Sequence, residues 1–220
     1  MKQIIVFLFA IFMTTSSVVN AQTSNQKEDT TKKEVPTAWT DVSLFDIDKI
    51  KESTTTPLIW YTHDNGKYYI ESRVNFDWAM TAGVFAGKTF SKNDKFWITP
   101  KFGCLFSFNK EGYNGLSPEF NFGGSVGKFR YFTMSQCAVS LNPEKNPSYL
   151  YGYYEAGYQL PYVKIGYASQ FFHPTDQSKT WTDQGPFMVI SYKEFYLKPW
   201  YTWDPSRNVQ KFIVGLGYHY

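Results

Sequence analysis

The sequence is poor in cysteine and in long apolar runs. Its two cysteines, Cys104 and Cys137, fall in predicted strands that are not neighbours, so we expect two free, buried thiols rather than one disulfide. Beyond the N-terminal end, no segment reaches the 18 or more apolar residues of a spanning helix. The net charge is only +3 and Lys and Arg form no cluster, which argues against a nucleic-acid partner.

Catalytic and metal-binding motifs are missing as well. The chain has no nucleotide-binding loop, no Cys-x-x-Cys zinc spacing and no Gly-x-Ser-x-Gly turn. The three histidines, His63, His173 and His219, are scattered over different predicted strands and loops. We therefore expect no enzyme, and no bound metal or cofactor.

The N-terminal end has the pattern of a secretory signal peptide. Lys2 supplies a positive charge, an apolar run extends from Ile4 to Met13, and Val19-Asn20-Ala21 forms a small-residue cleavage site. No cysteine stands near this site, which argues against a lipoprotein anchor. Residues 1–21 are thus predicted to be cleaved during export.

Aromatic residues are abundant. Phe, Tyr and Trp make up 20% of the chain, yet the mean hydropathy is −0.38. From Pro57 onward apolar and polar residues alternate: Tyr68 and Ile70 share one face of a predicted strand, and Glu71 and Arg73 share the other. Both properties are typical of a transmembrane β-barrel, in which lipid-facing aromatic residues alternate with polar lumen residues.

We predict ten antiparallel strands, with eight as the alternative. They cover residues 58–63, 67–90, 96–108, 116–126, 130–141, 149–160, 162–172, 187–192, 195–203 and 209–220. The connections 64–66, 109–115, 142–148, 173–185 and 204–208 are predicted to be extracellular, and the shorter ones and both termini periplasmic. Pro100 and Pro199 count against their strands, because each removes a ladder hydrogen bond.

The last predicted strand carries the clearest signal. Its apolar residues share one face and end on an aromatic: Phe212, Val214, Leu216, Tyr218 and Tyr220. This ending resembles the C-terminal assembly signal of bacterial outer-membrane β-barrel proteins. The resemblance implies an all-β fold, a closed antiparallel transmembrane β-barrel at residues 57–220. It also implies the outer membrane of a Gram-negative-type bacterium, with outer-membrane lipid and the barrel-assembly machinery as partners.

The opposite faces of the strands carry acids and bases in equal number. The acids are Glu71, Asp77, Glu119 and Glu155, and the bases are Arg73, Lys101, Lys164 and Lys198. The interior of a barrel of eight to ten strands is just wide enough for side chains, so we expect these charges to pair and fill it. The alternative is a selective polar channel lined by the same groups.

Residues 22–56 are polar and rich in Ser, Thr and Lys, which predicts a flexible periplasmic extension. Within it, Asp41 could cap a helix that places Leu44, Ile47 and Ile50 on one face. Such a helix could dock on another envelope protein or in the mouth of the barrel. The alternative is a loosely held tail.

Our leading functional hypothesis is a non-enzymatic scaffold or subunit of an envelope protein assembly. One alternative is a narrow pore for small solutes. Another is a lipid-modifying outer-membrane enzyme, for which His173 is the one suitably placed residue. A secreted, lipocalin-like carrier is the soluble alternative, and it would need an apolar inside and a polar outside.

Overall fold

A computed structural model describes residues 40–44, 58–64, 68–75, 81–92, 95–108 and 112–218. Within these ranges no helix is long and apolar enough to cross a membrane. The regular structure of the described residues consists of thirteen strands. They are β1 (Thr40–Leu44), β2 (Leu58–Asp64), β3 (Tyr69–Asn75), β4 (Thr81–Gly87), β5 (Phe90–Lys92), β6 (Phe96–Ser107), β7 (Gly115–Val126), β8 (Phe129–Ser140), β9 (Tyr149–Gln159), β10 (Val163–Pro174), β11 (Trp181–Tyr192), β12 (Phe195–Asp204) and β13 (Val209–Tyr218).

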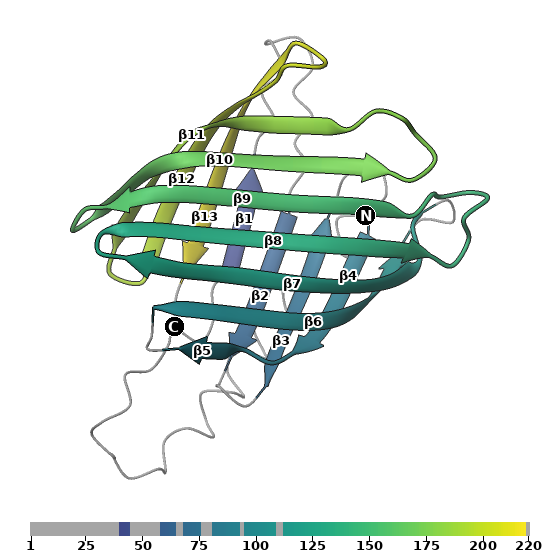
Figure 1. The fold of residues 1–220 in the computed structure, drawn as a ribbon, viewed down its shortest axis with the longest axis horizontal. Coiled ribbons are helices and arrows are strands. Elements are labelled where there is room, and N and C mark those ends of the chain that lie inside the picture. Colours follow the sequence, from purple (N-terminus) through teal and green to yellow (C-terminus); the bar gives the residue numbers. More distant parts are fainter. Residues whose placement is uncertain are drawn as a thin grey trace, which may run out of the picture. The chain divides into compact units, whose positions relative to one another are not determined.

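All thirteen strands belong to one antiparallel sheet, as the alternating sequence predicts (Figure 1). Consecutive strands pair with each other, apart from β4 and β5, and two further pairings join β1 to β13 and β4 to β6. Figure 1 shows β6 to β9 across the front and β1 to β3 with β13 behind them. With the exception of β4 and β5, strands that are adjacent in the chain are therefore also adjacent in the sheet.

The predicted strand 67–90 is divided in the structure. It contains β3, β4 and the start of β5, and β3 and β4 pair antiparallel from Tyr69 opposite Gly87 to Asn75 opposite Thr81. The chain thus reverses direction between residues 75 and 81. Alternation alone does not report such a reversal, because the side chains on both sides of it keep the same period of two.

Pro100 explains why β4 and β5 are separate. The two strands follow β6 in a single register, in which Gly87 pairs with Lys101 and Phe90 pairs with Ile98. The break lies opposite Pro100, which has no N–H to donate, although its carbonyl still accepts a hydrogen bond from the Lys88 N–H at 3.3 Å. Pro100 and Pro199 both lie inside strands, β6 and β12, so the doubt raised against those two predicted strands was wrong.

The additional reversal changes the side on which the first hairpin lies. We call one end of the sheet the loop end: it carries the connections 108–114, 141–148, 175–180 and 205–208. The other is the turn end, with the connections 93–95, 127–128, 160–162 and 193–194. The pairings of β2, β3, β4 and β6 place Asp64 and Tyr69 at the turn end. The prediction that connection 64–66 shares a side with the long loops was therefore wrong, because it treated 67–90 as one strand.

The N-terminal part of the sheet also differs from the prediction. β1 lies within residues 22–56, which were predicted to be a flexible extension, and it pairs with both β2 and β13. Leu44 ends this strand opposite Val214 and is not part of a helix. Ile47 and Ile50, the other members of the predicted docking segment, lie outside the described residues. The apolar pattern of this segment is too short to distinguish a helix from a strand, and the backbone of β13 supplies the hydrogen bonds that select the strand.

The two faces of the sheet have opposite chemistry. On the outer face large apolar side chains are exposed, such as Phe102 at 52% and Phe120 at 46%. On the inner face polar and charged residues are buried, such as Glu71 at 0% and Lys101 at 5%. A soluble protein buries its apolar residues and exposes its charges. The arrangement therefore contradicts the lipocalin-like alternative.

The cysteines and the last strand follow this division. Cys104 and Cys137 are both free, but Cys104 is exposed on the outer face, so the prediction that it is buried was wrong.

In the last strand, β13, Phe212 and Leu216 are exposed at 39% and 46%, Val214 is half-buried, and the strand ends at Tyr218. Tyr220, the final residue of the predicted assembly signal, lies outside the described residues.

Candidate functional site

Charged side chains on the inner face form three clusters. The balanced cluster consists of Glu71 and Arg73 from β3, Lys101 from β6 and Glu119 from β7. The lysine cluster consists of Glu155 from β9, Lys164 from β10 and Lys198 from β12. The loop-end cluster consists of Asp183 from β11, Asp204 from β12, Arg207 from the following loop and Lys211 from β13.

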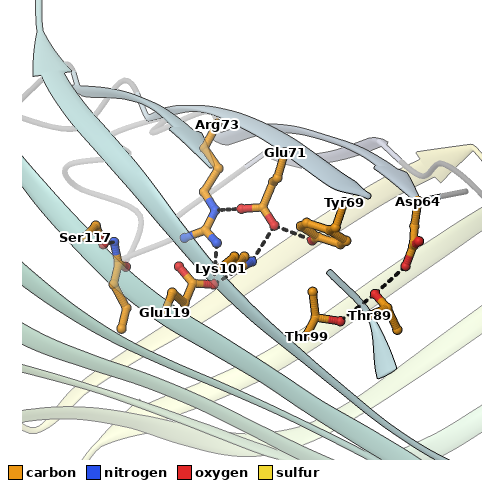
Figure 2. Close-up of polar contacts among 10 residues, drawn as sticks. Asp64, Tyr69, Glu71, Arg73, Thr89, Thr99, Lys101, Ser117 and Glu119 are labelled. Atoms are coloured by element: carbon orange, nitrogen blue, oxygen red, sulfur yellow. Dashed lines mark hydrogen bonds and ion pairs between the residues drawn. The ribbon is translucent and has the colours of Figure 1, made fainter. Parts of the chain in front are cut away.

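In the balanced cluster two acids meet two bases (Figure 2). Lys101 Nζ lies 2.5 Å from Glu71 Oε2 and 2.7 Å from Glu119 Oε1. Arg73 Nη2 lies 2.5 Å from Glu119 Oε1, and Arg73 Nε donates to Glu71. The exposed fraction of the side chains is 12% for Arg73 and zero for the other three. Each charge is therefore offset inside the cluster, with almost no access to solvent.

Aromatic residues complete the surroundings of the balanced cluster. The Tyr69 hydroxyl donates to Glu71 Oε2 at 2.5 Å, and the Lys101 Nζ lies 5.1 Å from the centre of the Tyr69 ring. Phe85, on the intervening strand β4, lies under both bases, with its ring centre 4.4 Å from Arg73 Cζ and 5.5 Å from Lys101 Nζ. The face of an aromatic ring attracts cations, so these contacts add to the ion pairs.

The lysine cluster has one more cation than anion. Lys164 Nζ lies 2.6 Å from Glu155 Oε1, and Lys198 Nζ lies 2.6 Å from Glu155 Oε2. The Tyr153 hydroxyl donates to Glu155 Oε2 at 2.7 Å and accepts from Lys198 at 2.7 Å. Both ammonium groups lie 5.2 Å from the centre of the Phe187 ring. The two lysine side chains are 19% and 20% exposed, so this cluster stays in contact with solvent.

The loop-end cluster is again balanced. Asp183 Oδ2 accepts hydrogen bonds from Lys211 Nζ and Gln170 Nε2, each at 3.1 Å. Arg207 Nη2 lies 3.6 Å from Asp183 Oδ1, and Arg207 Nε lies 2.5 Å from Asp204 Oδ2. The cluster thus ties the loop between β12 and β13 to the inner face of β11.

Two rows of aromatic rings also line the inner face. The inner aromatic row consists of Trp97, Phe132, Tyr153 and Trp200, with successive ring centres 5.8, 6.0 and 5.7 Å apart. The loop-end aromatic row consists of Tyr113, Tyr149, Phe172 and Trp181, with successive ring centres 5.2, 4.9 and 5.2 Å apart. Each row lies beside a charged cluster: Tyr153 binds Glu155, and Trp181 lies 5.7 Å below the guanidinium carbon of Arg207. The inner face therefore presents flat apolar surfaces next to charge.

A cavity of about 300 Å³ opens at the turn end. Its lining includes the cations Lys95, Arg130 and Lys164, the acid Glu155, and the rings of the first two members of the inner aromatic row. Lys95 lies directly before β6, and Arg130 lies near the start of β8, after the tight turn at 127–128. Positive charge therefore predominates among the charged groups that line this cavity.

The structure groups seven of the eight charged residues predicted to face the lumen. Four form the balanced cluster, three form the lysine cluster, and Asp77 lies outside the described residues. The loop-end cluster was missed because residues 173–185 were predicted to be a loop. The structure begins β11 at Trp181. The available signal was that Trp181, Asp183 and Phe187 fall on one face at a period of two.

The residues considered for other chemistry lie apart. His173 is on β10 near the loop end, where its Nδ1 lies 3.0 Å from the Thr180 hydroxyl. His63 is on β2 near the turn end, and His219 lies outside the described residues. In the described part of the chain no group of three or more His, Cys, Asp and Glu side chains could hold a metal ion.

Solved structures of outer-membrane proteins resemble this chain. The KdgM porin in complex with disordered oligogalacturonate has a TM-score of 0.61 and 15% sequence identity, over 83% of this chain and 99% of the porin. The NanC porin has a TM-score of 0.58 and 9% identity, over 82% of this chain and 98% of the porin. No protein-family model matches the chain, and no curated protein matches it.

These likenesses correct the leading functional hypothesis from the sequence. A scaffold or subunit of an envelope assembly was expected, but the two solved structures described above are porins. The scaffold hypothesis was therefore wrong. At these identities the likeness shows the fold, which is that of the small outer-membrane β-barrel proteins.

Proposed function

We propose that the protein is a non-enzymatic outer-membrane pore for small solutes. The observation that carries this proposal is the division of the sheet into an exposed apolar face and a buried, charged inner face, on a fold shared with porins. A membrane-spanning barrel needs the apolar face toward lipid, and a solute pathway needs the polar face toward water.

We further propose that the sheet closes into a transmembrane barrel. The pairings of β1 with β13 and of β4 with β6 support closure, because the first joins the first and last strands of the chain and the second bridges the one break between consecutive strands. If β4 and β5 count as one strand interrupted opposite Pro100, the described strands number twelve, where ten were predicted. An even number of strands is the rule for bacterial barrels of a single chain.

The orientation follows from the two ends of the sheet. Bacterial outer-membrane barrels have long extracellular loops and short periplasmic turns, so the loop end would be extracellular. The turn end would face the periplasm, after export with cleavage of residues 1–21. The aromatic C-terminal residues would then lie where the barrel-assembly machinery acts, and outer-membrane lipid would surround the outer face.

The charges of the inner face favour anionic solutes. The balanced and loop-end clusters each pair two acids with two bases, whereas the lysine cluster holds two cations for one anion. Lys95 and Arg130 add positive charge at the cavity beside it. A narrow pathway that passes excess positive charge lowers the energy of anions relative to cations.

Reconstitution tests this function. The mature chain, refolded in detergent and added to planar lipid bilayers, should give a steady conductance, whereas heat-denatured protein should give none. Fractionation of the source bacterium should recover the chain in the outer membrane. Protein that shows the heat-modifiable gel mobility of a folded barrel but no steady conductance would contradict a pore.

A further inference from the structure

We propose that the cavity at the turn end is a binding subsite for a sugar ring that carries a carboxylate or phosphate group. The proposal rests on the pore function and adds to it a place where the solute is held. It combines two features that meet in one cavity: three cations and a wall of aromatic rings.

The cations provide the anion-binding half of the subsite. Lys95 and Arg130 are exposed residues, and Lys164 reaches the cavity from the lysine cluster, where Glu155 supplies the one acid of the lining. One guanidinium nitrogen of Arg130 donates to the Gly127 carbonyl at 3.0 Å, which holds the side chain beside the turn. A guanidinium has five N–H donors in a planar fork, so it can bind a carboxylate or phosphate through further donors.

The aromatic wall provides the other half. Trp97 and Phe132 line the cavity, and their ring centres lie 5.8 Å apart at 35°. The Trp97 ring packs against Gly123, where an added Cβ would lie only 2.5 Å from Trp97 Cζ2. A glycine is therefore needed at this position for Trp97 to keep its place. A bare anion gains nothing from such rings, whereas the C–H groups on the face of a sugar ring pack against them as an apolar surface.

The volume limits the size of the solute. About 300 Å³ lies at the lower end of the roughly 300–1,000 Å³ range of small-molecule pockets. Such a cavity suits a single sugar unit. A longer chain would have to extend along the pathway, where the inner aromatic row continues through Tyr153 to Trp200.

Calorimetry tests the subsite independently of transport. The full mature chain, folded in detergent micelles, would be titrated with glucuronate, glucose 6-phosphate, glucose and acetate. We expect glucuronate or glucose 6-phosphate to bind roughly tenfold or more tightly than glucose and acetate, and the stronger of the two identifies the anionic group. Glucose binding equally well would overturn the role of the cations, and acetate binding equally well would overturn the role of the rings.

Variants locate the binding site. Arg130→Gln should weaken binding of the charged sugar roughly tenfold, whereas Lys179→Gln, an exposed change in the 175–180 loop, should leave it unchanged. Trp97→Ala should weaken it too, with Trp203→Ala on the outer face as the matched control. Gly123→Ala should displace Trp97 and weaken sugar binding, whereas Gly215→Ala, where an added Cβ has its nearest neighbour at 3.5 Å, should not.

The outcomes separate the subsite from the pore. A folded protein that conducts ions but binds none of the four probes overturns the subsite and leaves the pore function intact. A protein that binds a charged sugar through Arg130 but shows no conductance overturns the pore function. Equal loss of binding in the site variants and in their controls would also overturn the placement of the subsite. Gel mobility before and after heating checks that each variant is folded.

Discussion

The balanced cluster and the lysine cluster are built in the same way but differ in charge and exposure. In each, groups from three strands meet above an aromatic ring of an intervening strand, Phe85 in one and Phe187 in the other. The balanced cluster offsets every charge and excludes solvent from three of its four side chains. The lysine cluster leaves one cation in excess and keeps both lysines about one-fifth exposed.

This difference assigns the two clusters different roles. A buried, fully paired network has no charge left for a solute, and its removal mainly costs stability. An exposed cluster with excess charge gains less from its pairs but can attract ions from solution. We therefore propose that the balanced cluster stabilises the packing of β3, β6 and β7, and that the lysine cluster attracts solutes in the pathway.

The largest expected effect is on stability, in the balanced cluster. Glu71→Ala removes a carboxylate shared by Arg73 and Lys101 and leaves both bases with Glu119 alone. The loss in the free energy of unfolding should be about 3–5 kcal/mol, the usual effect of breaking a buried ion pair. Urea unfolding in lipid vesicles, followed by tryptophan fluorescence, measures it. Glu144→Ala, in the exposed 141–148 loop, is the control, and an equal loss there would remove the distinction between buried and exposed charge.

A somewhat smaller effect is expected on the outer face. The contrast between the clusters assumes that lipid surrounds the sheet, so a charge placed at mid-strand on the outer face should be unfavourable. Phe120→Arg, in the middle of β7, should lower the free energy of unfolding by about 2–4 kcal/mol in lipid vesicles. Leu141→Arg, in a loop at the loop end, should lower the free energy of unfolding by only about 0–1 kcal/mol. Equal costs at the two positions would mean that the outer face does not span a bilayer.

The smallest effect on stability is expected in the lysine cluster. Glu155→Gln removes the carboxylate between Lys164 and Lys198, but water reaches both lysines, so the loss should be only about 1 kcal/mol. The same change should increase the preference of the pore for anions, because two ammonium groups then lack an offsetting charge. Glu119→Gln should destabilise the protein more and change selectivity less. If Glu155→Gln instead destabilised the protein more than Glu119→Gln and changed selectivity less, the roles assigned to the two clusters would have to be exchanged.

The sequence predicts the faces of the sheet better than its connections. A period of two is readable wherever an apolar residue alternates with a charged one, which is why Glu71, Arg73, Lys101 and Glu119 were all placed on the inner face. The same period continues through the reversal after Asn75, so it cannot show that β3 and β4 are separate strands. The side on which the first hairpin lies depended on that reversal and was predicted wrongly.

The sequence could not predict which charged residues of the inner face form a cluster together. Which acid meets which base depends on the stagger between strands, as in the direct pairing of Lys101 with Glu119 on neighbouring β6 and β7. The excess charge of the lysine cluster therefore remained hidden in a total of four acids and four bases. β1 was missed for a related reason. Its five residues are held as a strand by pairing with β2 and β13, and such pairing between distant segments cannot be predicted from the propensities of the five residues themselves.

The reversal potential of the reconstituted pore across a potassium chloride gradient tests the central claim most directly. If the inner face forms a pore and the lysine cluster lies on its pathway, the wild-type conductance should favour chloride over potassium. The double variant Lys164→Gln with Lys198→Gln should lose that preference, while Lys145→Gln with Lys179→Gln, in the loops of the loop end, should retain it. A steady conductance that favours potassium in the wild type, or a chloride preference unchanged in the Lys164 and Lys198 double variant, would contradict the account.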